Sequence, residues 1–260
     1  MLTSSHLHEL WSYRDLIIRL AWSDFKLRYK NSALGFFWSL LEPLLMLLIL
    51  YVVFSNLMRV QVEHYQLFLL LGIILWNFLD RGTSMSISGI IGKPSLVQKV
   101  YFPRDILILS TCTTALMMTL LEFVVFIIFM AFFEVVPGMT VAYFPLLFIF
   151  EFLIILGLSM ALSALNVYFR DVQFIWRLIV QVGFFATPIL YPITIFPEKI
   201  RWIVMLNPVA LIITMMRDSI LYKTSPEPFN LAYIALSTLI LLLSGYFIFD
   251  RLEPKFAESI

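Results

Sequence analysis

The chain has 260 residues, of which 61% are hydrophobic and 13% are charged, and its mean hydropathy is +0.93. Soluble domains are closer to half apolar and a quarter charged, so a single water-soluble core cannot bury this many apolar side chains. The net charge of +1 gives no indication of nucleic-acid binding, and the single cysteine, Cys112, excludes a disulfide within the chain. The composition therefore predicts an integral membrane protein.

The first 34 residues are expected to be cytoplasmic and to form an amphipathic helix over residues 16–29. At helical spacing, one face of this helix is apolar and aromatic and another carries lysine and arginine. Such a helix lies at a membrane surface with its cations near the lipid headgroups. The apolar face contains Ile18, Trp22, Phe25 and Tyr29, and the polar face contains Arg19, Ser23, Lys26 and Lys30. No cleavable signal peptide is expected, because these residues lack a short apolar core.

Six segments are apolar over about the 20 residues that a helix needs to cross a bilayer. They are residues 35–56, 65–88, 106–133, 141–167, 174–195 and 231–249. The pattern predicts an all-α integral membrane protein with six transmembrane helices. Charges inside such spans are costly and are expected to face a partner or a water-filled path. These charges are Asp80, Arg81, Glu122, Glu151 and Arg177.

Two short helices are predicted in residues 197–222, between the fifth and sixth spans. The segments 197–206 and 209–221 are each too short to cross the bilayer alone, and their lengths are typical of re-entrant or interfacial helices. Pro208 lacks a backbone donor and restricts Asn207, which favours a bend between them. We expect an extracellular re-entrant pair, with two ordinary surface helices as the alternative.

The distribution of lysine and arginine predicts the orientation. With six spans, eleven of these residues fall in connections on the side of the N-terminus and five fall on the other side, Arg217 among the five. The side with the excess is the cytoplasmic one. Both termini are therefore expected in the cytoplasm, in a multi-pass protein of the plasma (cell inner) membrane.

No pattern in the sequence predicts an enzyme. Residues 89–95 approach a phosphate-binding loop, but only two residues separate the glycines and Pro94 directly follows Lys93. The histidines are isolated and the acidic residues of the spans stand alone, so neither a metal site nor a catalytic carboxylate pair is expected.

The cytoplasmic connection 88–105 predicts a short helix over residues 94–101, beginning at Pro94 and ending before Pro103. Exposed Leu96, Val97 and Val100 on this helix could contact a soluble partner or rest on lipid headgroups.

Four local motifs resemble the membrane subunits of ABC-2 type exporters, in particular the permeases that export lipid-linked polysaccharides such as O-antigen or teichoic acid. The first is Leu27-Arg28-Tyr29-Lys30-Asn31-Ser32, followed by Leu34-Gly35 and by residues 38–43. The others are Asn166-Val167-Tyr168-Phe169-Arg170-Asp171, Thr187-Pro188-Ile189-Leu190-Tyr191, and Asn207-Pro208. The motifs occur in this order among the six spans, and together the motifs and spans extend over nearly the whole chain.

The resemblance implies a homodimer of this chain with two copies of a cytosolic ABC ATPase, which would bind the ATP and magnesium; this chain would hold no cofactor. Residues 16–29 would form the interfacial or gate helix. The ATPase would contact the coupling segment formed by Pro94, Leu96, Val97, Val100 and Tyr101. Arg170 and Asp171 would have a structural or coupling role, and Asn207 and Pro208 would join the helices that close the outer mouth.

The substrate implied by the resemblance is a glycan attached through diphosphate to a polyprenyl lipid. Arg28 and Lys30 would meet the diphosphate, unless they only anchor the helix to anionic headgroups. Sugars would slide over aromatic rings of the first and fifth spans. These rings are Phe36, Phe37, Trp38, Tyr51, Phe184 and Phe185.

The sequence is also compatible with two other functions. An ABC-2 exporter of a drug or small lipid would have a compact cavity in place of a continuous tunnel. A membrane-embedded enzyme acting on polyprenyl-linked substrates would need acidic or histidine clusters on one membrane face, whereas the inner connections carry only Asp105 and Asp171, far apart in the sequence.

Overall fold

The computed structural model describes residues 10–57, 62–94, 96 and 102–256, and every regular element in that part of the chain is a helix. Five helices are long and apolar enough to cross a membrane. They are α3 (Phe37–Tyr51) continued by the π-helix η1 (Val52–Leu57), α4 (Tyr65–Ile87), α6 (Asp105–Phe132), α7 (Phe144–Tyr168) preceded by η2 (Met139–Tyr143), and α11 (Pro228–Leu252). The prediction of an all-α integral membrane protein is confirmed.

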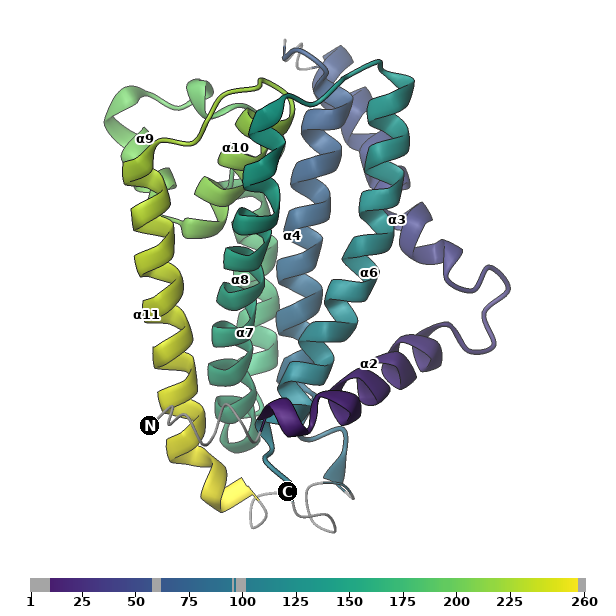
Figure 1. The fold of residues 1–260 in the computed structure, drawn as a ribbon, viewed down its shortest axis with the longest axis vertical. Coiled ribbons are helices and arrows are strands. Elements are labelled where there is room, and N and C mark those ends of the chain that lie inside the picture. Colours follow the sequence, from purple (N-terminus) through teal and green to yellow (C-terminus); the bar gives the residue numbers. More distant parts are fainter. Residues whose placement is uncertain (1–9, 58–61, 95, 97–101, 257–260) are drawn as a thin grey trace.

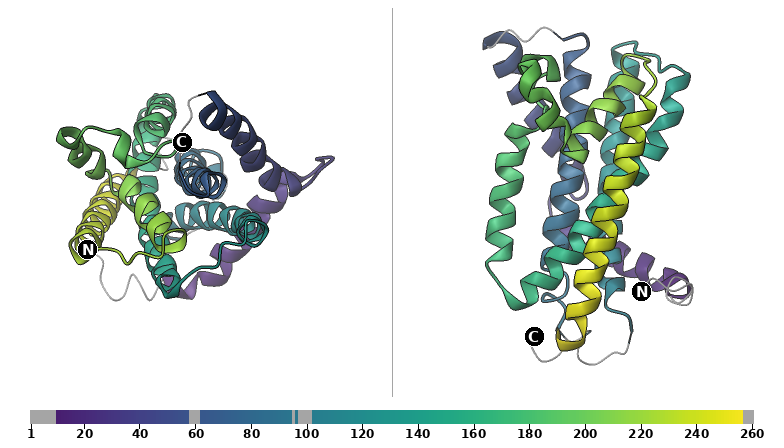
Figure 2. Two further views of the ribbon diagram at one scale, coloured as in Figure 1. Left: turned by 90° about the horizontal axis from the view of Figure 1, so that it is seen from above. Right: turned by 90° about the vertical axis from the view of Figure 1, so that its left-hand side faces the viewer.

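Helix α4 is the centre of the bundle. It packs against α3, α6, α7, α8 (Val172–Ala186) and α10 (Pro208–Ile220), and Figure 2 shows it enclosed by other helices when seen from above. Residues on every side of α4 are buried, for example Leu69, Leu70 and Leu71 in succession. A helix that is apolar all round is buried all round. The other helices are therefore arranged around α4.

Helices α7 and α11 approach each other closely at two glycines. A Cβ atom built on Gly245 would lie 1.9 Å from the carbonyl oxygen of Gly157. Small residues at helix crossings allow such backbone contact in membrane proteins. This crossing fixes α11 against the bundle.

Two of the charges in the predicted spans form a buried ion pair. Arg81 of α4 donates to Glu122 of α6, and both side chains are almost fully buried. The carboxylate of Glu151 on α7 is also buried, and its two oxygens have no hydrogen-bond partner within the described part of the chain. Arg81, Glu122 and Glu151 thus face the protein interior as expected. Asp80 is only half-buried, and Arg177 is exposed on the surface of α8, so the expectation was wrong for Arg177 within one chain.

Helix α8 is shorter than the predicted fifth span, because it ends at Ala186 rather than at residue 195. Its 15 residues extend over about 22 Å, less than the roughly 30 Å of a hydrocarbon core. The chain continues as a buried, non-helical segment over residues 187–190. Pro188 explains the break, because its ring would clash with the preceding helical turn and it has no N–H to donate.

The region predicted to be re-entrant contains η3 (Ile193–Ile195), α9 (Glu198–Met205) and α10. Helices α9 and α10 meet at an angle of 103° at Asn207-Pro208. Side chains of α10 are largely buried in the bundle, whereas α9 has none that are buried. The bend, and the entry of α10 into the bundle, are as predicted from Pro208.

Helix α2 (Arg14–Tyr29) lies across the lower end of the bundle, and η4 (Glu253–Lys255) follows α11 at the same end (Figure 1). Helices α9 and α10 lie at the opposite end. The element expected to contact lipid headgroups and the pair expected outside the cell are therefore at opposite ends of the molecule.

Candidate functional site

The turn from α2 to α3 forms a hollow with cationic and aromatic walls. Helix α2 ends at Tyr29, and the chain then reverses through Asn31 (φ 63°) and Gly35 (φ 55°). Asn and Gly enter this left-handed region at the lowest cost, which explains why a sharp turn forms here. The hollow has a volume of about 560 Å³. It is lined by Ser23, Phe25, Lys26, Leu27, Tyr29, Lys30 and Phe36.

The rings of α2 form a stack beside the two lysines of this hollow. Trp22 and Phe25 are stacked with centroids 5.5 Å apart, and Phe25 meets the edge of Tyr29 at 5.3 Å. The Lys26 ammonium lies 5.9 Å from the centroid of Trp22, at cation–π distance. Neither Lys26 nor Lys30 forms an ion pair with a carboxylate among the described residues. Both positive charges are therefore available to an anion.

Arg28 is on the same helix but does not line the hollow, and its side chain is exposed. It is two residues from Lys26, which corresponds to about 200° around a helix. The structure thus brings Lys26 beside Lys30, whereas the sequence analysis named Arg28 with Lys30. The role of Arg28 in substrate binding stays a prediction.

Helices α3 and α8 each bury only one narrow strip. On α3 the buried residues are Ser39, Pro43 and Leu47, and on α8 they are Val180 and Phe184, all spaced by one helical turn. The remaining surfaces are apolar and exposed, and Figure 2 shows α3 and α8 on the same side of α4. Exposed residues on them include Leu45, Leu48 and Ile49 of α3, and Phe174, Ile175, Leu178, Ile179 and Val182 of α8.

The aromatic residues predicted to contact sugars fall into two groups. Four of them are 46–60% exposed: Phe36, Phe37, Trp38 and Phe185. Phe184 is instead buried against Trp76, with centroids 6.4 Å apart. Tyr51 is half-buried beside Tyr65, at 6.1 Å. The exposed surface of the chain therefore presents the first group.

The predicted coupling segment is described only in part. Pro94 is exposed, while Val97, Val100 and Tyr101 lie outside the described residues. Leu96 was predicted to be exposed, but it is half-buried because it packs against the hydrophobic core. Arg170 and Asp171 are exposed on the turn between α7 and α8. Their coupling roles stay predictions.

Arg217 is buried in the bundle, contrary to the prediction from sequence. It was counted as a cation of an outer connection, but it is 2% exposed and its guanidinium donates to three backbone carbonyls. The acceptors are Phe68 O (3.0 Å), Pro188 O (2.5 Å) and Ile189 O (2.9 Å). A charged residue inside a short apolar helix was the signal available in the sequence.

Three side chains hold the non-helical segment 187–190. Besides Arg217, the Tyr65 hydroxyl donates to Leu190 O at 2.6 Å. Asn207 caps α10 by accepting from Val209 N at 3.1 Å, and its amide donates to the Thr187 hydroxyl at 3.4 Å. The motifs Thr187-Pro188-Ile189-Leu190-Tyr191 and Asn207-Pro208 are therefore parts of one structural unit, which we call the outer clamp: residues 187–190, Tyr65, Asn207 and Arg217.

Comparison with known proteins identifies the family of this chain. Residues 15–221 match the ABC-2 type transporter family. The chain belongs to the ABC-2 type transporter family. It is 33% identical over 250 residues to the O-antigen export system permease protein RfbA of Klebsiella pneumoniae, with 95% of each chain covered. It is 31% identical over 256 residues to the protein of the same name from Myxococcus xanthus, with 98% of each chain covered.

A more distant relative extends the comparison. The chain is 24% identical over 247 residues to the polysialic acid transport protein KpsM of Escherichia coli, covering 91% of this chain and 93% of the relative. The family resemblance predicted from the four motifs is thus confirmed. In this ABC-2 protein the motifs lie at the turns that set the directions of α3, α8 and α10.

Proposed function

We propose that this chain is the membrane-spanning permease subunit of an ATP-driven exporter that moves a lipid-linked polysaccharide, of the O-antigen or teichoic-acid kind, out of the cytoplasm. The observation that carries the proposal is similarity over nearly the full length to permeases named for O-antigen export. The match runs from α2 through the outer clamp. It therefore includes both the cationic hollow and the surfaces of α3 and α8.

The energy for transport comes from a separate ATPase. The sequence has no complete phosphate-binding loop, so ATP and magnesium are bound by two copies of a cytosolic partner subunit. The partner contacts the end of the bundle that carries α2 and the connection 88–105. This end faces the cytoplasm of a plasma-membrane protein, with both termini on that side.

Two copies of the chain form the path. The apolar surfaces of α3 and α8 lie on one side of α4, and pairing two such sides removes them from lipid and encloses a passage between them. Phe36, Phe37, Trp38 and Phe185 are exposed on these surfaces and supply flat apolar faces for sugar rings. A tunnel built this way suits a long glycan better than a compact cavity would.

The hollow between α2 and α3 receives the lipid-linked end of the substrate. Lys26 and Lys30 meet the diphosphate as point charges, and the exposed Ile18 and Trp22 allow the polyprenyl chain to stay in the adjacent lipid. The diphosphate thus enters the path paired with lysine side chains, and does not enter the apolar core of the bilayer as an unpaired charge.

The test is export by the purified permease–ATPase complex in proteoliposomes loaded with polyprenyl-diphosphate-linked glycan. Lys26→Gln with Lys30→Gln should reduce ATP-dependent translocation at least tenfold, because both cations of the hollow are lost. Arg28→Gln is the matched control: it removes one cation from the same helix but outside the hollow, and we expect a smaller loss.

The outcomes separate the two parts of the proposal. Absence of ATP-dependent glycan translocation by the wild-type complex would refute the export function. Wild-type translocation by the double lysine variant would refute the hollow as the diphosphate site and leave export itself standing. A larger loss in the Arg28 variant than in the lysine variant would restore the assignment made from sequence.

A further inference from the structure

The cytoplasmic connection between α4 and α6 is attached to α2 near its first residues and to η4 near its last residues. Near its start, Lys93 Nζ lies 2.6 Å from Asp24 Oδ2 of α2. Near its end, Arg104 donates its Nη1 to the carbonyl oxygen of Glu253 at 2.9 Å and its backbone N–H to the Glu253 carboxylate at 3.3 Å. A displacement at either end of the connection therefore acts on the attachment at that end.

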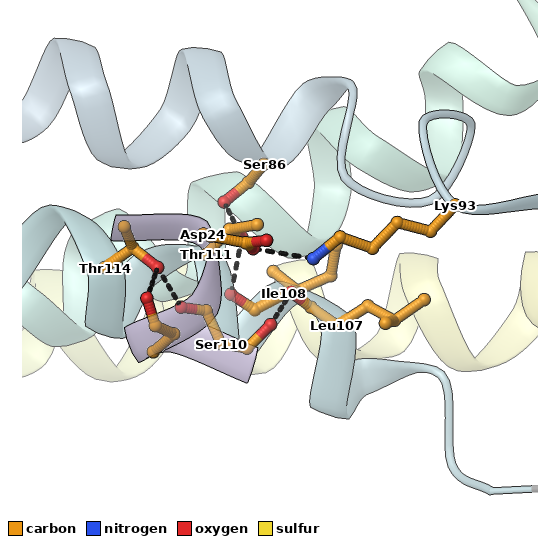
Figure 3. A network of polar contacts seen from close by, with 9 residues as sticks. Asp24, Ser86, Lys93, Leu107, Ile108, Ser110, Thr111 and Thr114 are labelled. Atoms are coloured by element: carbon orange, nitrogen blue, oxygen red, sulfur yellow. Dashed lines mark hydrogen bonds and ion pairs between the residues drawn. The ribbon is translucent and has the colours of Figure 1, made fainter. Parts of the chain in front are cut away.

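The Asp24–Lys93 pair is the only ion pair that joins α2 to another element within the described residues. Its two side chains are 19% and 21% exposed, so it is partly shielded from water. Such a pair is stronger than one on an open surface, where screening and side-chain entropy cancel most of the attraction. Figure 3 shows Lys93 reaching across to Asp24 beside the polar contacts of α6.

Both partners lie on backbone that is tied to its surroundings by hydrogen bonds. One helical turn before Asp24, Ala21 is fully buried and its carbonyl accepts from the Thr114 hydroxyl of α6 at 3.2 Å. On the other side, Gly92 N donates to Ser88 O at 2.8 Å and Lys93 N donates to Ile90 O at 3.2 Å, which makes a tight turn directly after α4. A movement of this turn therefore acts on α2 through the ion pair.

We infer that the Asp24–Lys93 ion pair is the positioning link through which the ATPase-driven displacement of the connection turns α2 and opens the Lys26–Lys30 hollow. This inference rests on the proposed function, since it requires an ATPase acting on the connection. Asp24 precedes Lys26 by two residues and Lys30 by six, so a rotation of α2 at Asp24 moves both cations together. The pair positions the cations; it does not itself bind substrate.

The test is charge exchange in the reconstituted complex, with glycan translocation and ATP hydrolysis measured on the same samples. Asp24→Lys and Lys93→Asp should each lower the amount of glycan exported per ATP hydrolysed at least fivefold, while the complex still assembles and hydrolyses ATP. The double variant Asp24→Lys with Lys93→Asp should recover at least half of the wild-type ratio, because the pair is re-formed with its charges reversed. Asp15→Lys, an exposed acid on the same helix, should keep the wild-type ratio.

Each result decides the matter. A wild-type export ratio in both single variants would overturn the inference, and so would failure of the double variant to recover although it assembles. If a charge-reversed chain does not fold, Asp24→Asn and Lys93→Gln replace it, and an unchanged ratio in these neutral variants overturns the inference equally. Failure of the proposed function is recognised separately, because wild-type protein would then show no ATP-dependent export at all.

Discussion

Replacing Arg217 by methionine should destabilise the end of the bundle that contains α10, because the guanidinium donates hydrogen bonds to backbone carbonyls that have no helical partner. Residues 187–190 are non-helical and buried between helices. Non-helical backbone at membrane depth is tolerated only where protein or water provides hydrogen-bond partners. The Phe68 carbonyl lies within α4 and keeps its helical partner, but the carbonyls of Pro188 and Ile189 lose the donors that Arg217 gives them.

The magnitude follows from these two carbonyls. A buried polar group left without a partner costs about 1–3 kcal/mol, so the pair costs about 2–6 kcal/mol. The contact of the guanidinium with the Phe68 ring, at 3.5 Å, adds about 1–2 kcal/mol to the loss. Relief from burying the charge offsets several kcal/mol of the total. We expect a net loss near 3 kcal/mol, which corresponds to a fall in Tm of about 6–12 °C.

The assay is thermal unfolding of the protein in lipid nanodiscs, followed by tryptophan fluorescence, together with hydrogen exchange of peptides covering residues 187–191. Arg217→Met should lower Tm and raise exchange in these peptides. Arg217→Lys should recover only part of the loss, since one ammonium cannot reproduce the planar fork that reaches three carbonyls. Gly72→Ala should act in the same direction, because its new Cβ would lie 2.2 Å from Arg217 Nη2.

Arg201→Met is the matched control. Arg201 also donates to two carbonyls, those of Phe196 and Thr194, but in a segment that is more open to solvent. Water can replace it, so its loss should change Tm by no more than about 2 °C. This role of Arg217 would be refuted if Arg217→Met changed Tm as little as Arg201→Met does and residues 187–191 stayed protected from hydrogen exchange. The guanidinium would then not be the group that holds the non-helical segment.

Two further predictions concern other parts of the bundle. Gly245→Ala should force α11 away from Gly157 and cost about 1–3 kcal/mol, measured as a lower Tm. Gly138→Ala should cost less, because the atoms nearest to its new Cβ belong to the Lys223 side chain, which can shift. Equal melting temperatures of the two variants would contradict the close crossing. Burial raises the pKa of Glu253 against the opposing effect of Arg104, so the folded protein binds this proton more tightly than the unfolded chain. Stability should therefore fall as pH rises from the ordinary glutamate pKa through the raised value and stay level above it; Glu253→Gln should remove this dependence and be the more stable form at pH 7, and superimposable Tm–pH curves would contradict the assignment.

The long helices were predictable from sequence because the ends of the apolar runs coincide with the ends of the helices. The span predicted over residues 65–88 is α4 (Tyr65–Ile87), and that predicted over residues 106–133 is α6 (Asp105–Phe132). Both agree to within one residue at each end. Hydropathy suffices here because a bilayer allows few alternatives to a helix.

The parts that depend on distant contacts were not predictable. Arg217 bonds to Phe68, 149 residues earlier in the chain, so its sequence neighbourhood indicates a charge in a short helix and not its partners. Likewise, the choice between Lys26 and Arg28 depends on which side of α2 faces the turn to α3. The end of α8 was marked by Pro188, but the continuing apolar run outweighed that signal in the sequence analysis.

The distribution of buried contacts separates a fixed part of the molecule from parts that can move. Helices α4 and α10 are buried over most of their surfaces, α7 meets α11 backbone to backbone, and the outer clamp joins α4 to α10. By contrast, within a single chain α2 buries only Ala21, and α3 and α8 each bury one narrow strip. Elements with few buried contacts have the lowest free energy of local rearrangement. An ATP-driven change should therefore move α2 relative to the core of its own chain, and should move α3 and α8 where the surfaces of two chains meet. These three helices carry the cationic hollow and the exposed aromatic residues.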